Sequence, residues 1–200
     1  MNVTNETLVG TDIRDKIVFP ASYDNVHRNG IIHRAVHLEI YLKNNNRLVW
    51  KRNDGRLEIP GGHVVWDEKN DSAETYTCAA AREITEELNL EVNWQCSAGI
   101  AIERITNRLK KLVKIANQLP SSSGINNEWV QVYCLEWNIT EDGDPQNFVL
   151  GHEGNSEPEW CQINELANKA VTSPKNINSA LRLMLLRNGI LIPLSAEVLS

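Results

Sequence analysis

Residues 61–90 read GGHVVWDEKNDSAETYTCAAAREITEELNL, and this stretch decides the expected fold. Its second half predicts a helix over residues 71–88, with Asp71 as the N-cap and Glu74 at the capping-box position three residues later. Asn89 follows as a residue that tolerates a left-handed conformation at a helix C-terminus. Apolar and small residues at helical spacing predict the buried face, namely Ala73, Thr77, Ala80, Ala81, Ile84 and Leu88.

Three carboxylates, Glu83, Glu86 and Glu87, gather on one face of this helix, which spans about 100°. The like charges at Glu83 and Glu87 lie four residues apart and cost a bare helix roughly 0.2–0.5 kcal/mol. Negative charge in the last turns also opposes the helix dipole. A bound divalent cation would reverse both effects, because Mg²⁺ and Mn²⁺ prefer carboxylate oxygens. The alternative is a solvated acidic face.

The residues around these carboxylates resemble the Nudix box, G-x5-E-x7-R-E-U-x-E-E-x-G-U, in which U is a bulky aliphatic residue. The match covers Glu74-x7-Arg82-Glu83-Ile84-x-Glu86-Glu87-x-Asn89-Leu90. Asn89 replaces the final glycine of the box, a mild change because Asn tolerates a positive φ.

The second departure from the box is the distance between its glycine and its first glutamate. Eleven residues rather than five separate Gly62 from Glu74. An insertion of about six residues within WDEKNDSA explains this distance, since a loop tolerates extra residues at little cost. Alternatively Glu68, which stands at the G-x5-E position, takes the role of Glu74. Glu74 is preferred because it keeps the helical spacing to Arg82.

The resemblance implies an α+β fold, an α/β/α sandwich around a mixed sheet, with an extra helix inserted after the box helix. It implies Mg²⁺ or Mn²⁺ as cofactor and hydrolysis of a diphosphate bond in a nucleoside-diphosphate-linked or related small molecule. By position, the metal ligands are Glu83, Glu86, Glu87 and the carbonyl of Gly61, while Glu74, Arg82 and Gly62 brace the box loop.

The resemblance also implies a glutamate as general base, either in the box or in a distal loop. Glu86 and Glu87 are the box candidates. The distal candidates are Glu128, Glu153 and Glu157, and we expect Glu157 in this role because it lies in a long loop before Trp160. The alternative for each distal residue is a solvated glutamate.

The segment VHRNGIIHRAVHLEIYL, residues 26–42, resembles the start of the isopentenyl-diphosphate-isomerase-like branch of the superfamily. That branch raises isomerisation of an isoprenoid diphosphate as an alternative function, but Gly61 occupies the position of the isomerase cysteine. On the same analogy His33, His37 and His63 are possible metal ligands, although His33 and His37 are interpreted as ordinary strand residues. A second alternative is a non-catalytic Nudix-type ligand-binding protein, which the complete set of charged box residues disfavours.

The rest of the chain predicts further elements and three regions: an N-terminal extension at 1–30, a Nudix domain at 31–173, and a C-terminal helix and tail at 174–200 packed on it. Residues 1–30 read as irregular. Alternation and helical spacing predict strands at 33–42, 47–52 and 128–137, helices at 102–116, 163–171 and 176–189, and a long loop at 141–159.

Three further residues are candidates for contacts with the substrate. The helix expected at 102–116 carries Arg104, Arg108, Lys110, Lys111 and Lys114 on its polar side, so Arg108 and Lys111 are candidates for phosphate contacts. A solvated basic face is the alternative. Trp66 is a candidate for stacking on a base, with packing as the alternative.

Composition restricts the class of protein. The chain has 200 residues and a net charge of −6, which argues against a general nucleic-acid or membrane-surface binder. Its four cysteines form no C-x-x-C pair, so reduced thiols are expected. No signal peptide or membrane span is recognised, which predicts a cytoplasmic protein. A homodimer is possible, since many relatives are dimers.

Overall fold

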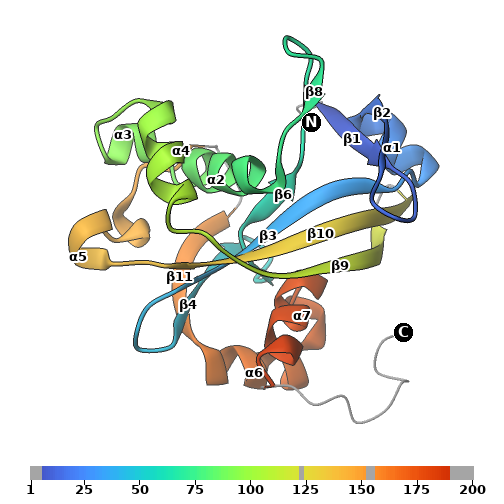
Figure 1. Cartoon of the computed structure of the whole chain (residues 1–200). Coiled ribbons are helices and arrows are strands. Elements are labelled where there is room, and N and C mark those ends of the chain that lie inside the picture. Colours follow the sequence, from blue (N-terminus) through green and yellow to red (C-terminus); the bar gives the residue numbers. More distant parts are fainter. Residues whose placement is uncertain (1–5, 122–123, 152–155, 190–200) are drawn as a thin grey trace.

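The computed structural model describes residues 6–121, 124–151 and 156–189, and Figure 1 shows its arrangement. The strands are β1 (Thr7–Thr11), β2 (Ile17–Ser22), β3 (His33–Tyr41), β4 (Asn46–Arg52), β5 (Leu57–Glu58), β6 (Gly61–His63), β7 (Trp66–Asp67), β8 (Ser72–Ala73), β9 (Lys110–Ser121), β10 (Gly124–Glu136) and β11 (Ser156–Gln162). The helices are α1 (Tyr23–Asn29), α2 (Tyr76–Glu87), α3 (Leu90–Asn93), α4 (Ala98–Thr106), α5 (Ile139–Asp142), α6 (Ile163–Thr172) and α7 (Ser179–Arg187), with short 3-10 helices η1 (Pro145–Asn147) and η2 (Pro174–Asn176).

A mixed sheet forms the centre of the molecule. β3 pairs in parallel with β10, while β9 pairs antiparallel with β10 and β6 pairs antiparallel with β3. β4 carries β11 and β5 as antiparallel neighbours. This mixture of parallel and antiparallel strands with helices confirms the expected α+β class.

Helices cover both faces of this sheet, with α2 and α4 on one side and α6 and α7 on the other (Figure 1). Apolar side chains that point to opposite faces of the strands explain this layering. Val36, Leu38 and Ile40 of β3 pack in one core cluster with Ile84 of α2. A second cluster joins Val49, Leu57, Ile59 and Cys161 to the helices through Leu166, Leu181, Met184 and Leu185.

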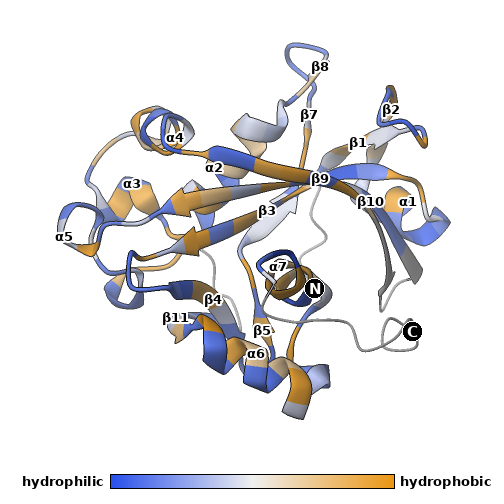
Figure 2. Cartoon of the chain, turned by 60° about the horizontal axis from the view of Figure 1, so that its bottom comes forward, coloured by the Kyte–Doolittle hydropathy of each residue, from blue (hydrophilic) through white to orange (hydrophobic). Residues whose placement is uncertain are grey.

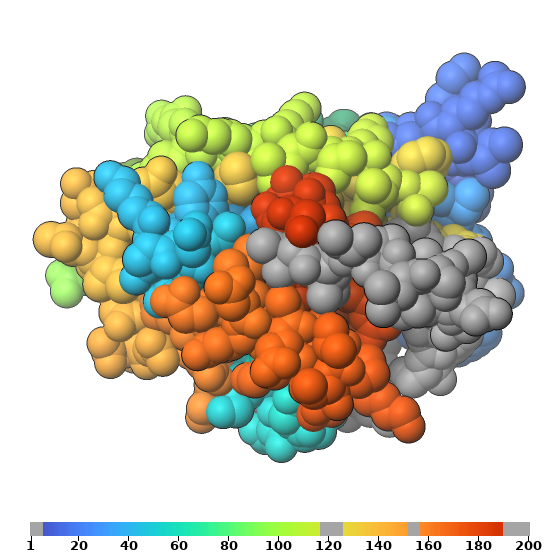
Figure 3. Space-filling model, turned by 90° about the horizontal axis from the view of Figure 1, so that it is seen from below, coloured from blue at the N-terminus to red at the C-terminus, as the bar shows by residue number. Residues whose placement is uncertain are grey.

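Figure 2 shows α6 and α7 in front of the sheet, each with hydrophobic and hydrophilic stretches. In Figure 3 the same two helices, in orange and red, cover this face beside the hairpin of β3 and β4 in blue. The predicted helices at 163–171 and 176–189 are confirmed as α6 and α7, and the predicted strands at 33–42, 47–52 and 128–137 as β3, β4 and the main part of β10.

The helix that carries the carboxylates begins later than the capping-box pattern predicts. α2 starts at Tyr76, and its N-cap is Thr75, whose hydroxyl accepts a hydrogen bond from the backbone N–H of Cys78. The predicted N-cap Asp71 is wrong, because this residue has φ 46° and lies in the hairpin of β7 and β8. That hairpin contains the extra residues between Gly62 and the helix. Asn89 has φ 46°, which confirms the left-handed residue expected after the helix.

Residues 102–116 are not one helix, which corrects the sequence-based prediction. α4 ends at Thr106 and the chain continues as β9 from Lys110. Val113 and Ile115 alternate with exposed Lys114 and pack against a cluster that contains Val130 of β10. An alternation of period two with β-branched residues favours a strand, so the helical spacing of these apolar residues was misleading.

Two segments that read as irregular contain regular structure. Within 6–30 the chain forms β1, β2 and α1, and Gly10 of β1 pairs with His33 of β3, which places this hairpin on the central sheet. The segment 141–159, which was predicted to be a loop, contains the end of α5, all of η1 and the start of β11. The four cysteines are free. In the part of the chain that the structure describes, no helix is long and apolar enough to cross a membrane.

Candidate functional site

The last turns of α2 place Glu83, Glu86 and Glu87 beside β6. Glu83 lies directly against Gly62, since a Cβ atom built on Gly62 would stand 2.2 Å from the carboxyl carbon of Glu83. A side chain at position 62 would therefore collide with this carboxylate. Glu83 is 15% exposed, whereas Glu86 is 60% exposed. Gly62 thus gives the Glu83 carboxylate close access to the backbone of β6.

Arg82 forms ion pairs with three glutamates at the centre of this site. Its Nε and Nη2 atoms each lie 3.2 Å from an oxygen of Glu74. Its Nη1 lies 3.0 Å from Glu83 and 3.1 Å from Glu86. Nη2 also donates to the carbonyl of His63 over 2.8 Å. The guanidinium therefore joins the end of the loop, the helix and β6.

The geometry distinguishes the two glutamates that the sequence left open for the box position. Glu74, and not Glu68, contacts Arg82. Glu68 accepts a hydrogen bond from the Thr7 hydroxyl over 2.8 Å, at the hairpin of β7 and β8. Glu74 lies eight residues before Arg82 and contacts it, although Glu74 precedes the first residue of α2.

Burial makes the charged forms of two of these carboxylates costly. Loss of solvent raises the pKa of Glu83 to about 7, with Arg82 opposing the shift and Glu86 adding to it. Loss of solvent and the neighbouring Glu83 raise the pKa of Glu87 to about 8. Two partly buried carboxylates supply hard oxygen donors, which fit Mg²⁺ or Mn²⁺ and would be stabilised in their charged form by either cation.

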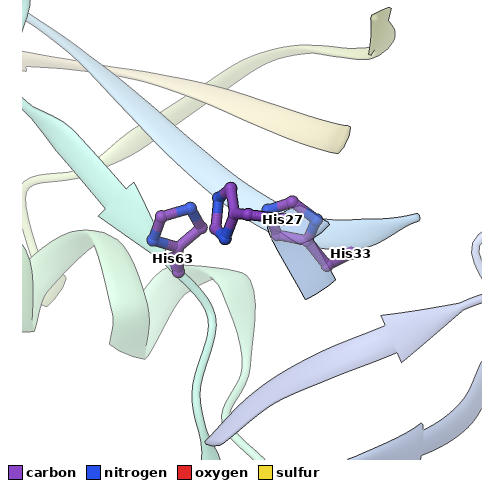
Figure 4. A group of neighbouring side chains, drawn as sticks. All are labelled: His27, His33 and His63. Atoms are coloured by element: carbon purple, nitrogen blue, oxygen red, sulfur yellow. The ribbon is translucent and has the colours of Figure 1, made fainter. Parts of the chain in front are cut away.

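Three imidazoles meet on the other side of β6 (Figure 4). His27 comes from α1, His33 from β3 and His63 from β6, and their candidate ligand atoms all lie within 4.8 Å of one another. Glu128 of β10 adds a carboxylate oxygen 3.7 Å from His33 Nε2 and 3.8 Å from His63 Nε2. The sequence offered His33 and His63 as possible metal ligands but not His27, because His27 lies on a helix that the sequence did not reveal.

Backbone contacts orient two of these rings. Nδ1 of His27 lies 2.9 Å from the carbonyl of Tyr23, and Nδ1 of His33 lies 3.0 Å from the carbonyl of Ile31. A carbonyl can only accept, so Nδ1 is the donor in both rings and Nε2 is the atom left for a ligand. Burial lowers the pKa of His33 to about 4, which keeps it neutral. Within the described parts of the chain, the buried Nε2 of His33 has no hydrogen-bond partner.

A cavity of about 300 Å³ connects this histidine group with the glycine strand. Gly61 and Gly62 line it together with His27, His63 and Glu128. β6 therefore separates two clusters of potential ligand groups, the carboxylates of α2 and the imidazoles. A ligand in this cavity would contact the same strand that supports Glu83.

The structure places the other predicted site residues elsewhere. In the antiparallel pair of β11 and β4, Pro158 opposes Trp50 and Glu157 opposes Lys51. Opposed residues share a face and neighbours alternate, so Glu157 points away from the face of Trp50. Glu153 lies outside the described residues.

The three candidate substrate contacts do not line the cavity. Arg108 lies 2.8 Å from Asp142 Oδ2 and donates to the carbonyl of Glu136, so it holds a structural ion pair. Lys111 is exposed on β9, opposite Tyr133. Trp66 pairs with Ala73 in the β7 and β8 hairpin and packs against the main core cluster.

The chain resembles known proteins in structure rather than in sequence. No protein-family model and no curated protein matches it. The crystal structure of DR0079 from Deinococcus radiodurans is similar with a TM-score of 0.59 at 20% identity, over 91% of this chain and 98% of that one. Similarity at this identity shows a shared fold.

Other solved structures are similar at lower scores. The C. elegans Ap4A hydrolase has a TM-score of 0.42 at 19% identity, over 78% of this chain and 97% of the hydrolase. The NUDIX domain of Shewanella oneidensis NrtR, solved with ADP ribose, has a TM-score of 0.43 at 15% identity, over 67% of this chain and 75% of that one.

Proposed function

We propose that the protein hydrolyses a diphosphate bond in a nucleoside-diphosphate-linked or related small molecule, with Mg²⁺ or Mn²⁺ as cofactor. The observation that carries this function is the pair of partly buried carboxylates, Glu83 and Glu87, beside the glycine strand and Arg82. A bound cation neutralises diphosphate oxygens and lowers the pKa of an attacking water. The resemblance to the Nudix box and the shared fold with DR0079 support the proposal.

Each residue of the site has its own proposed role. Glu83 and Glu87 would hold the cation, together with the Gly61 carbonyl that the resemblance implies. Arg82 keeps the loop end at Glu74 against the helix. Glu86, the most exposed of the three box glutamates, is the proposed proton acceptor, because an exposed carboxylate can reach a water molecule.

A substrate panel tests this function. Nucleoside triphosphates, ADP-ribose, NADH, dinucleoside polyphosphates and nucleotide sugars are each incubated with the protein and Mg²⁺ or Mn²⁺, and nucleotide or phosphate release is measured. We expect cleavage of at least one diphosphate, abolished by EDTA. If no member of the panel is cleaved with either metal, the proposed hydrolase function is wrong.

The alternative isomerase function has less support. The cavity contains no cysteine among the described residues that line it, and Gly61 stands where the resemblance places the proton-transfer thiol. Isomerisation would need another acid at that position.

The histidine group supports a second metal site. Imidazoles suit Zn²⁺ and other first-row transition metals, whereas Mg²⁺ prefers oxygen ligands. We therefore expect the protein, saturated with Mg²⁺, to bind one additional Zn²⁺ in equilibrium dialysis. His33→Ala should lose this ion, while His37→Ala, a change of a histidine outside the group, should keep it. Retention of the ion by both variants would refute this site.

The buried carboxylates predict an unusual dependence of stability on pH. An unfolded glutamate titrates near 4.3, about its ordinary value, whereas burial raises the pKa of Glu83 to about 7 and of Glu87 to about 8. Between about pH 4.3 and about pH 8, the folded, metal-free chain thus binds more protons than the unfolded chain. Its free energy of unfolding should fall as pH rises from about 5 to about 8. Mg²⁺ binds the folded, deprotonated state and should offset the loss.

Thermal unfolding measures this effect. In EDTA, we expect the Tm to fall by several degrees across this pH range, and Mg²⁺ to raise it more at the higher pH. The double variant Glu83→Gln with Glu87→Gln is the control and should show a flatter profile. An identical pH profile for the wild type and the double variant would contradict the prediction.

A further inference from the structure

Trp50 lies on β4 and reaches across to the last residue of α2. Its indole Nε1 donates a hydrogen bond to Glu87 Oε2 over 3.0 Å. The side chain is only 5% exposed and belongs to the same core cluster as Ile84 of α2. The ring is therefore fixed by packing, and the direction of its N–H is fixed with it.

The position of Glu87 explains why such a donor is needed. Glu87 ends α2, where unsatisfied carbonyls give the helix a negative end, and the last turn carries no basic residue. The backbone N–H of Gly61 also favours the charged form of this carboxylate and so lowers the pKa of Glu87 against the effect of burial. Glu87 thus accepts a hydrogen bond from β4 and lies close to the backbone of β6. A carboxylate offers about four lone-pair positions, so these contacts leave oxygen capacity for a cation.

We propose that Trp50 is a positioning residue for Glu87, which holds the carboxylate in the orientation that the divalent cation requires. This inference rests on the proposed metal-dependent function. Hydrogen bonds from outside the ligand set orient metal-binding side chains, and their loss typically costs about 10–100-fold in metal affinity. In this protein the orienting group is an indole from the central sheet rather than a second charged residue.

Binding of Mn²⁺ tests the inference without a substrate. Free Mn²⁺ has a strong paramagnetic resonance signal that decreases on binding, so titration of the full-length protein gives the dissociation constant directly. We expect Trp50→Phe to raise this constant about 10–100-fold, because the ring remains and the N–H donor is lost. At saturating Mn²⁺, kcat should return to within about twofold of the wild type, since the cation then restores the orientation of Glu87.

Two further proteins separate positioning from packing. Benzothienylalanine at position 50 has nearly the same shape as tryptophan but lacks the N–H, and it should weaken Mn²⁺ binding as Trp50→Phe does. Trp160→Phe is the matched control, because the indole of Trp160 donates to Asp144 and not to the box. It should leave the Mn²⁺ dissociation constant unchanged.

Different results would overturn the role of Trp50 and the proposed metal-dependent function. Wild-type affinity for Mn²⁺ in both position-50 proteins would overturn the role of Trp50 and leave the metal site intact. Equal losses in Trp50→Phe and Trp160→Phe would also overturn it, because a general loss of packing would then explain both. Absence of Mn²⁺ binding by the wild type would refute the proposed metal-dependent function itself.

Discussion

Glu87→Gln is expected to lower kcat/KM for a cleaved diphosphate by about 10²–10³-fold, comparable to the loss of one preorganised electrostatic contact at a reaction centre. The amide keeps the shape of the side chain and can still accept from the Trp50 indole. It cannot supply the negative charge that holds a divalent cation. The loss should therefore appear in the metal-dependent step.

A glutamate outside the site provides the control for this prediction. Glu165 is exposed in the first turn of α6, and Glu165→Gln removes the same charge from the protein. We expect this variant to keep wild-type kcat/KM under the same Mg²⁺ and Mn²⁺ concentrations. Full activity in Glu87→Gln would contradict the assignment of Glu87 as a metal ligand.

Asp142→Ala is expected to destabilise the fold by about 1.5–3 kcal/mol, because it removes a buried carboxylate that accepts hydrogen bonds from two partly exposed arginines. The side chain of Asp142 is 1% exposed and contacts Arg104 at 2.7 Å and Arg108 at 2.8 Å. It also accepts from the backbone N–H of Asn138. Without the carboxylate, both guanidinium groups lose their acidic partner, although Arg108 keeps its hydrogen bond to the carbonyl of Glu136.

Urea unfolding of Asp142→Ala and Glu141→Ala measures this effect. Glu141 is the adjacent acidic residue of α5 and is exposed, so its removal should change the free energy of unfolding by about 0.5 kcal/mol or less. Similar midpoints for the two variants would show that the Asp142 ion pairs contribute little to stability.

The same ion pair explains one failure of sequence-based reasoning. Arg108 belongs to a set of basic residues whose spacing resembles one face of a helix. Its partner Asp142, however, lies 34 residues further along the chain. Such a pairing depends on the tertiary fold, and neither spacing nor composition contains it. The strand preference of Val113 and Ile115 was present in the sequence, although a helical period fitted the same apolar residues equally well.

The carboxylate helix was easier to predict because its pattern is local. Glu74, Arg82 and Glu83 are related by spacing along one short segment, and the buried side of α2 follows a single helical period. The histidine group is the opposite case, since His27, His33 and His63 come from three different elements. Only the pairing of β6 with β3 and the packing of α1 bring them together, and neither could be derived from the residues themselves.

The hairpin of β7 and β8 is a place where residues can be inserted between Gly62 and Glu74. In Figure 1 it extends away from the sheet, and its tip residues, including Lys69 and Asn70, are exposed. Exposed loop tips of this kind tolerate inserted sequences better than any packed segment. The hairpin is therefore a natural attachment point for an affinity tag or a fluorescent reporter close to the carboxylates, without interruption of the strand or the helix that carries them.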